Sequence, residues 1–411
     1  LTDVKKINGR LDRIQEFYEN KIERQSVIDV IKECSDIERI LSKISANKSN
    51  PRDVLGLACS LNSIEHLYDI VKNSQLFKNY SLLKSKKDLK PLIKIIQQTI
   101  SEDSPVNYLK GGFINDNVDS ELDEYRKISN DATEWLINYQ REIEKETGIK
   151  KVKVGYNRVF GYYIEVSKAN IEKVPDYFIR KQTLTNAERY FTEELKDYEN
   201  KILSSQEKIV MIELEIFNRL QSEVLQKIEH ILFNSDILSM IDIASSFSEI
   251  SEKRNYVRPV LNNSSSVVME GARHAVIEHL LDSEDEFIEN SINVCKKKNQ
   301  ISIITGPNMS GKSTYLRQIG IIVIMAQAGC FVPCDKAEIS IVDRLFTRVG
   351  ASDNLTSGES TFLVEMNETA NILNNLTDRS LILLDEIGRG TSTFDGLSIA
   401  WSITEYLHES K

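Results

Sequence analysis

The clearest chemistry in the sequence lies at Gly306 to Ser313, which follows the pattern GxxxxGKS. In such a loop the glycines let backbone N–H groups turn inward around phosphates, at the positive end of the helix that follows. Lys312 would reach the β- and γ-phosphates of a nucleotide, and the Ser313 hydroxyl would ligate Mg²⁺. Ile301, Ile303 and Ile304 predict the short buried strand that should precede the motif. The predicted nucleotide-binding residues are Gly306, Pro307, Asn308, Met309, Ser310, Gly311, Lys312, Ser313 and Thr314.

A second element supports this interpretation. Residues 381–384 form a continuous apolar run that ends in Asp385 and Glu386. Such a run fits a buried strand of a parallel sheet, whose carboxyl end faces the ligand crevice. Asp385 would help to hold Mg²⁺, and Glu386 would polarise the water that attacks the phosphate. A strand-end Asp-Glu alone is usually structural, but beside the phosphate loop it predicts an ABC-type ATPase with Glu386 and Lys312 as catalytic residues.

The composition describes an ordinary globular chain. It has 411 residues, 41% of them hydrophobic and 28% charged, which is enough for two to four domains. The sequence contains no apolar run long enough to span a bilayer, and the start at Leu1-Thr2-Asp3 has neither Met nor a signal peptide, so we expect a cytoplasmic fragment of a longer protein. Five scattered cysteines form no disulfide framework, and Cys330 with Cys334 lacks further ligands for zinc.

The net charge of −10 excludes a chain that coats nucleic acid along its whole surface. Residues 151–190 nevertheless hold eight Lys and Arg against four Asp and Glu. This stretch is rich in β-branched and aromatic residues, with Gly155 and Gly161 as turn signals, so it predicts a small β-rich module. Basic residues interleaved with aromatic ones can hold phosphates and sugars. Most of the aromatic residues are expected to form the core of the module: Tyr156, Phe160, Tyr162, Tyr163 and Tyr177.

Two long apolar repeats flank the basic stretch. The first has a heptad pattern at Leu122, Tyr125, Ala132, Leu136, Tyr139 and Ile143. The second begins at Leu195 and continues toward Leu232. Both exceed the length of a typical globular helix, so we expect two extended antiparallel helices with the β-rich module at their tip. A plain coiled-coil spacer fits the same pattern. Residues 1–118 are predicted to be helical, with Pro51 at the first position of one helix.

The segments of the nucleotide site resemble one family. Residues 305–314 are similar to the phosphate loop of MutS proteins, with Ser310 where bacterial members usually carry Gly. Residues 385–396, which read DEIGRGTSTFDG, are close to a fingerprint of that family. Residues 357–366 resemble the segment that completes the site of the partner subunit, which implies that Ser360 contacts the γ-phosphate in trans. A helix N-cap is the alternative role for this serine.

The resemblance extends to both sides of the phosphate loop. Residues 271–278 are similar to the Gly-Arg-His-Pro segment of the family, with an inserted Ala272 and with Ala275 in place of Pro. This resemblance implies a nucleotide contact for His274. Phe287 is found where the family places an aromatic ring against adenine, and a place in the apolar core is the alternative role for this phenylalanine.

The basic module also resembles a part of this family. Residues 154–164 and 180–190 are similar to the DNA clamp of bacterial MutS and to its return toward the lever helix. A clamp of this kind contacts the DNA backbone independently of sequence. The candidate DNA-binding residues are Lys153, Asn157, Arg158 and Lys168.

Membership in this family would imply a DNA mismatch repair ATPase that uses ATP and Mg²⁺. Such a protein clamps double-stranded, mismatched DNA, forms a homodimer through its ATPase domains and acts with a downstream factor of the MutL type. It would couple nucleotide state to clamp opening and sliding in a bacterial cytoplasm, at the nucleoid. The N-terminal mismatch-reading and connector domains, and the extreme C-terminus, are expected to lie outside this sequence. Two rivals are a MutS homologue that acts on recombination intermediates and a non-MutS ABC-type ATPase with a coiled-coil arm.

The expected fold class is multidomain. It combines a helical core, long antiparallel lever helices, a small β-rich clamp at the lever tip and a C-terminal α/β P-loop (ABC-type) ATPase domain. The expected boundaries are 1–118 for the core, 119–150 for the first lever helix, 151–190 for the clamp, 191–245 for the second lever helix, 246–265 for the return to the core and 266–411 for the ATPase domain, which is C-terminally incomplete.

Overall fold

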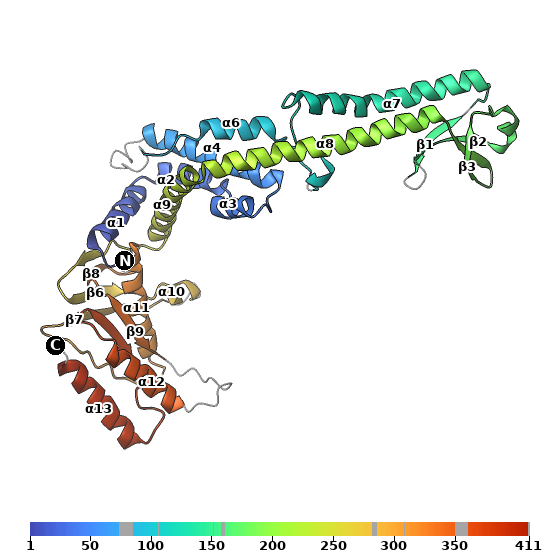
Figure 1. Ribbon diagram of the computed structural model, residues 1–411. Helices are drawn as coiled ribbons and strands as arrows, with labels where there is room; N and C mark the ends of the chain where they lie inside the picture. Colours follow the sequence, from blue (N-terminus) through green and yellow to red (C-terminus); the bar gives the residue numbers. More distant parts are fainter. Residues whose placement is uncertain are drawn as a thin grey trace. The chain divides into compact units, whose positions relative to one another are not determined.

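A computed structural model gives the structure of the chain (Figure 1). It describes residues 1–73, 85–105, 107–150, 152–157, 161–281, 286–307, 309–349 and 361–409. The chain divides into two compact units, with residues 1–32, 69–81 and 238–411 in one and residues 33–68 and 82–237 in the other. Within the described ranges, no helix is both long and apolar enough to cross a membrane.

Helices make up the N-terminal part of the chain, as the apolar spacing predicts. α1 (Val4–Glu19) begins at Asp3, whose carboxylate accepts the N–H of Lys5 at 2.8 Å. This helix ends at Glu19, with Asn20 as its C-cap. Pro51 opens its helix, as predicted. The further elements are α2 (Lys21–Lys32), α3 (Ile37–Ser45), α4 (Pro51–Asn73), α6 (Lys90–Thr99) and the 3-10 turn η2 (Tyr108–Lys110).

Two long helices follow and lie side by side in opposite directions (Figure 1): α7 (Ser120–Thr147) and α8 (Glu193–Gln226). Stacked rings of Trp135 and Tyr198 join them, with their centroids 3.6 Å apart. Residues of both predicted repeats are buried, among them Leu122, Tyr139, Ile143, Leu195, Ile202 and Ile216. The two apolar repeats therefore do form an antiparallel helix pair.

The second helix is shorter than its apolar repeat suggests. α8 ends at Gln226, and a separate helix, α9 (Ile228–Lys253), follows it. The N–H of Lys227 donates to the carbonyl of Val224 at 3.0 Å, three residues back. This bond replaces the four-residue spacing of an α-helix and interrupts the ladder. The continuous helix expected across 191–245 is thus divided, because apolar spacing does not report a single altered backbone hydrogen bond.

A buried ion pair ties the bases of the two long helices together. The Glu213 carboxylate on α8 is fully buried and accepts an N–H of Arg126 on α7 at 2.7 Å. It also accepts the backbone N–H groups of Gly112 and Phe113 at 2.7 and 3.3 Å. The other end of the guanidinium contacts the exposed carboxylate of Asp116 at 2.8 Å. One carboxylate thus links α7, α8 and the loop that enters α7.

Replacing Arg126 by methionine is expected to destabilise this helical unit by about 3–5 kcal/mol, because the Glu213 charge would stay buried without a cationic partner. Urea denaturation followed by circular dichroism measures the effect. Asp116→Asn is the matched control, since it removes only the exposed partner of the same guanidinium, and it should change stability by less than about 1 kcal/mol. Equal effects of the two variants would contradict the role assigned to the buried pair.

Four antiparallel strands at the end of α7 and the start of α8 form what we call the tip sheet. They are β1 (Lys153–Asn157), β2 (Gly161–Ser167), β3 (Ile179–Thr183) and β4 (Ala187–Phe191), with the 3-10 turn η3 (Lys168–Lys173) after β2. The order across the sheet is β1-β2-β4-β3. The β-rich module that the sequence predicts is therefore present.

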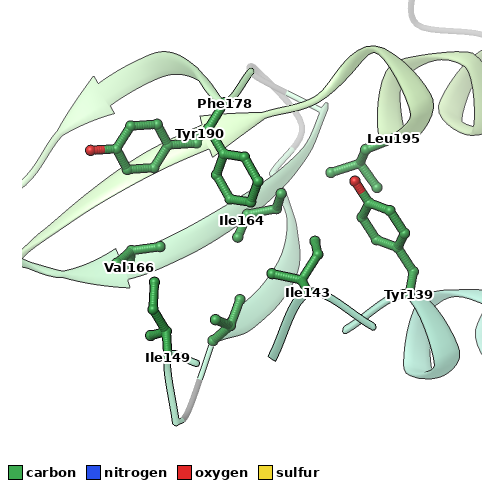
Figure 2. Close-up of a cluster of buried hydrophobic side chains, with 9 residues drawn as sticks. Tyr139, Ile143, Ile149, Ile164, Val166, Phe178, Tyr190 and Leu195 are labelled. Carbon is green, nitrogen blue, oxygen red and sulfur yellow. The ribbon is translucent and has the colours of Figure 1, made fainter. Parts of the chain in front are cut away.

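The core of the tip sheet includes residues of both long helices (Figure 2). Tyr139 and Ile143 of α7 and Leu195 of α8 pack against side chains of the strands, among them Ile164 and Tyr190. The hydroxyl of Tyr139 also contacts that of Thr192, the N-cap of α8. Burial, together with an accepting Glu188 carboxylate, raises the pKa of Tyr190 to about 12. The sheet and the two helix ends thus share one apolar core.

The C-terminal part of the chain combines strands and helices. A four-stranded sheet has the order β5-β8-β6-β7, and a separate parallel pair joins β9 to β10. The strands are β5 (Val260–Asn262), β6 (Ser266–Ala272), β7 (Asn290–Cys295), β8 (Lys336–Ser340), β9 (Arg344–Arg348) and β10 (Ser380–Leu384). The helices are α10 (Ile277–Leu280), α11 (Lys312–Ala328), α12 (Thr361–Asn374) and α13 (Thr393–Glu409).

One predicted strand does not form. Residues 301–304 adopt no regular structure, and Ile303 is 78% exposed. A strand requires a neighbour that exchanges ladder hydrogen bonds with it. Here β9 and β10 pair with each other, and residues 301–304 join neither of them. The prediction of a buried strand before the phosphate loop was wrong for this structure, whereas the parallel strand predicted at 381–384 is confirmed as β10.

Candidate functional site

The phosphate-loop segment leads directly into a helix. Gly311 has φ 88°, which glycine adopts without strain, and α11 begins at Lys312. The Lys312 ammonium donates to the carbonyl oxygens of Gly306 at 2.9 Å and Pro307 at 2.7 Å. Its charge therefore lies across the loop, where the sequence pattern places a bound phosphate. Asn308, another predicted nucleotide contact, lies outside the described residues.

The two predicted metal-binding residues lie in contact. The N–H of Asp385 donates to the carbonyl of Arg348 at 2.7 Å, which extends the parallel pairing of β10 with β9 by one residue. The Ser313 hydroxyl on the first turn of α11 donates to the Asp385 carboxylate. A hydroxyl and a carboxylate are oxygen ligands of the kind that Mg²⁺ prefers. Segments 72 residues apart in the sequence thus fit a shared magnesium ion.

Glu386 has an unusual backbone and a cationic neighbour. Its φ is 52°, in the left-handed region that non-glycine residues rarely adopt, and its carboxylate pairs with the Arg389 guanidinium. The loop then folds on itself, because a Cβ on Gly388 would lie only 2.6 Å from the carbonyl oxygen of Gly396. An open depression of 460 Å³ lies here, lined by Glu386, Ile387, Gly388, Arg389, Thr393, Gly396, Leu397 and Ala400.

His274 binds backbone groups at the start of α10, a role that the sequence did not predict. Its Nδ1 accepts the backbone N–H groups of Val276 at 3.3 Å and Ile277 at 3.2 Å, at the start of α10. The side chain is buried, and burial lowers the pKa of its imidazole. An Nδ1 that accepts hydrogen bonds carries no proton, so this geometry fits the tautomer with its proton on Nε2. Phe287 is half-buried in the segment before β7. Nucleotide contacts of His274 and Phe287 stay predictions, as does that of Ser360, which lies outside the described residues.

The tip sheet displays part of its predicted basic surface. Lys153 at the start of β1 and Lys168 at the start of η3 are exposed, and Asn157 is half-buried. Arg158 lies outside the described residues. Arg189 pairs with Glu165 at 3.0 Å, so its charge is compensated within the module. The exposed lysines are therefore the stronger candidates for contacts with phosphates.

The aromatic residues of this module are less buried than expected. Tyr163 is buried, and the Arg189 guanidinium lies 4.1 Å from its ring centre. Tyr162 is half-buried against the core, whereas Tyr156 is 52% exposed and Tyr177 is 48% exposed. Strand alternation explains the difference between neighbours on a strand, because successive side chains point to opposite faces. Phe160 lies outside the described residues.

The described residues define a mixed protein in which two paired long helices carry a small antiparallel sheet and the C-terminal part combines strands and helices. Two family models match the chain, MutS family domain IV over residues 117–208 and MutS domain V over residues 302–411. The first match covers α7, the tip sheet and the first part of α8. The second covers the phosphate loop and the Asp385-Glu386 strand end.

Curated relatives match over nearly the whole chain. The DNA mismatch repair protein MutS of Salinibacter ruber is 43% identical over 409 residues, which is 100% of this chain and 45% of the relative. The MutS proteins of Thermodesulfovibrio yellowstonii and Halothermothrix orenii are each 45% identical, over 100% and 99% of this chain and over 48% and 45% of their own lengths. This chain belongs to the MutS family, and it spans about half the length of the curated relatives it matches.

Proposed function

We propose that the chain provides the DNA-clamping and ATP-hydrolysing parts of a bacterial DNA mismatch repair protein. Relatives with the name of this activity match along the whole chain. The observation that carries the proposal is the contact between the Ser313 hydroxyl and the Asp385 carboxylate. It supports a P-loop ATPase of the ABC type, because it joins the phosphate loop to the end of β10, where Glu386 would polarise the attacking water.

The nucleotide chemistry follows from charges and hydrogen bonds. Lys312 and the backbone of residues 306–311 would bind the phosphates of ATP, and Ser313 with Asp385 would hold Mg²⁺. The bound ion would supply positive charge that stabilises the charge developing on the transferred phosphoryl group. Glu386 would accept a proton from the attacking water as general base. It must first leave its ion pair with Arg389, so the arrangement described here fits a resting state.

The DNA chemistry is electrostatic. The exposed lysines of the tip sheet, Lys153 and Lys168, would contact phosphates of a duplex, and Asn157 and Arg158 complete the proposed set. Such contacts carry no sequence information, which suits a clamp that must hold any duplex. Mispaired or unpaired bases would be recognised in the full-length protein, with ATP binding coupled to clamp opening and sliding.

Assembly and cell location belong to the same proposal. A homodimer through the ATPase domains would bring Ser360 to the γ-phosphate in the partner site, and a factor of the MutL type would act downstream. Action on chromosomal DNA would place the protein in the bacterial cytoplasm, at the nucleoid. We retain the domain division given by the sequence, with a core, two levers, a clamp and an ATPase domain. The second lever was expected to end at residue 245, whereas α9 continues to Lys253.

Membership in the MutS family excludes the rival of an unrelated ABC-type ATPase with a coiled-coil arm. The other rival, a MutS homologue for recombination intermediates, receives no support from the relatives described above, which are all named for mismatch repair.

Replacing Lys153 and Lys168 together by alanine should weaken the binding of every duplex, matched or mismatched, by a similar factor. Each lost phosphate contact reduces the slope of log affinity against log salt by about 0.9. Fluorescence anisotropy of labelled duplexes at several salt concentrations measures this slope, and DNA stimulation of ATP hydrolysis should require higher DNA concentrations.

The matched control is the double variant Lys5→Ala and Lys6→Ala, which removes the same charge from exposed positions on α1. Its salt slope should equal that of the unmodified protein. An unchanged slope for the variant of the tip sheet would overturn the proposed DNA contacts, and ATP hydrolysis that no DNA alters would overturn the proposed coupling.

A further inference from the structure

We propose that Glu365 on α12 is a positioning residue for Glu386, through the backbone of the loop between them. This inference rests on the proposed ATPase function and concerns the geometry of that same site. In the sequence, Glu365 stands out only as part of the segment 357–366. In the structure it is a buried carboxylate, 4% exposed, that faces a backbone N–H group of the loop.

The central contact is short and buried. The N–H of Gly388 donates to the Glu365 carboxylate at 2.5 Å. Hydrogen bonds to an ionised acceptor are shorter and stronger than neutral ones, and a buried N–H that loses its acceptor costs about 1–3 kcal/mol. Gly388 lies two residues beyond Glu386, and it has φ 83° and no room for a side chain against Gly396. The carboxylate therefore holds a loop in which Glu386 itself has a φ of 52°, a value that non-glycine residues rarely adopt.

The same helix meets the loop at a second point. A Cβ on Gly390 would lie 3.2 Å from the backbone of Phe362 on the first turn of α12. The loop thus lies against α12 at two positions. Gly388 is two residues beyond Glu386, and Gly390 is four residues beyond it. Because the Glu365 carboxylate holds a backbone N–H of the loop, and the loop approaches α12 closely at Gly390, we expect a shift of α12 to move the loop with it.

A further link connects α12 to the other carboxylate of the site. Glu368 pairs with the Arg348 guanidinium at 2.8 Å, and the carbonyl of Arg348 accepts the N–H of Asp385 at 2.7 Å. Glu365 and Glu368, one helical turn apart, therefore act on the backbone around Glu386 and Asp385. In this arrangement α12 would hold Asp385 and Glu386 in fixed positions relative to each other.

The test measures hydrolysis, nucleotide affinity and amide exchange in the full-length protein. Glu365→Ala should lower kcat about tenfold, because the unpaired N–H lets the loop move, while affinity for a non-hydrolysable ATP analogue stays within about twofold. Glu365→Gln keeps an oxygen acceptor and should restore kcat to within about threefold of the original. Hydrogen exchange at the loop amide of Gly388 should be faster in the alanine variant without nucleotide.

The matched control is Thr369→Val, which changes a buried side chain on the same helix whose hydroxyl donates within the helix to the Glu365 carbonyl. It should leave kcat and the exchange of the loop unchanged. Adding Glu365→Ala to Glu386→Gln should cost little further rate, because the positioned carboxylate is already gone. Full additivity of the two changes, or equal losses of kcat and analogue affinity, would overturn the positioning role.

The test distinguishes failure of the proposed role of Glu365 from failure of the proposed ATPase function. If the unmodified protein neither binds nor hydrolyses ATP, the proposed function fails at that step. If it hydrolyses ATP and Glu365→Ala keeps kcat and slow amide exchange, the ATPase stands and the role of Glu365 is refuted.

Discussion

Replacing Lys312 by alanine is expected to raise the dissociation constant for ATP roughly 100-fold or more. The ammonium lies across the phosphate loop, where it donates to the carbonyls of Gly306 and Pro307. Bound phosphates would replace these neutral acceptors with charged ones, and a hydrogen bond to a charged group contributes about 1.5–3 kcal/mol. Loss of two such bonds corresponds to the expected factor. Titration with a fluorescent ATP analogue measures the dissociation constant directly.

Lys336→Ala serves as the control for Lys312, because it removes an exposed lysine that pairs with Glu338 on the same strand, β8. This variant should bind the analogue as the unmodified protein does. Binding by Lys312→Ala within about threefold of the original would show that the loop does not cradle phosphates, since a lost charge-assisted bond must exceed that factor.

The second large effect concerns turnover. Glu386→Gln should reduce kcat by about 10²–10⁴, the usual contribution of a general base, and it should trap bound ATP. The amide keeps the size of the side chain, and nucleotide affinity should therefore persist, which separates this variant from the change at Lys312. Single-turnover hydrolysis and filter retention of radiolabelled ATP measure the two quantities.

Glu405→Gln provides the matched control for Glu386, since it makes the same chemical change at an exposed position on α13. Its kcat should match that of the unmodified protein. If the Glu386 variant hydrolyses ATP at the original rate, another group must activate the water, and the base assignment is wrong.

Sequence predicted best the features set by local patterns. The apolar repeats at Leu122 to Ile143 and from Leu195 gave the paired helices, because side chains at heptad spacing lie on one helix face. The alternating residues around Tyr163 gave the tip sheet in the same way. The contact of Ser313 with Asp385 was also foreseeable, since both residues were predicted from sequence patterns to hold the same Mg²⁺, even though the strand expected before the loop does not form.

Features that depend on distant partners could not be predicted in this way. Residues 301–304 have the composition of a buried strand, yet strand formation depends on a neighbour that the local sequence does not specify. The pairing of Arg126 with Glu213 joins residues 87 apart, and either side chain alone looks like a solvated charge. The Glu386–Arg389 ion pair could have been predicted from the sequence, because opposite charges three residues apart often meet in a tight turn.

The shared core of the tip sheet has consequences for folding during synthesis and for the choice of a fragment that can be studied alone. Tyr139 precedes the strands and Leu195 follows them, and both pack into the same cluster (Figure 2). On a ribosome, the strands would emerge before the side chain that completes their apolar contacts, so the module should stay open until the start of α8 has been synthesised. A piece excised at the strand ends would lack part of its interior. The smallest piece to retain every side chain of that cluster runs from Tyr139 to Leu195.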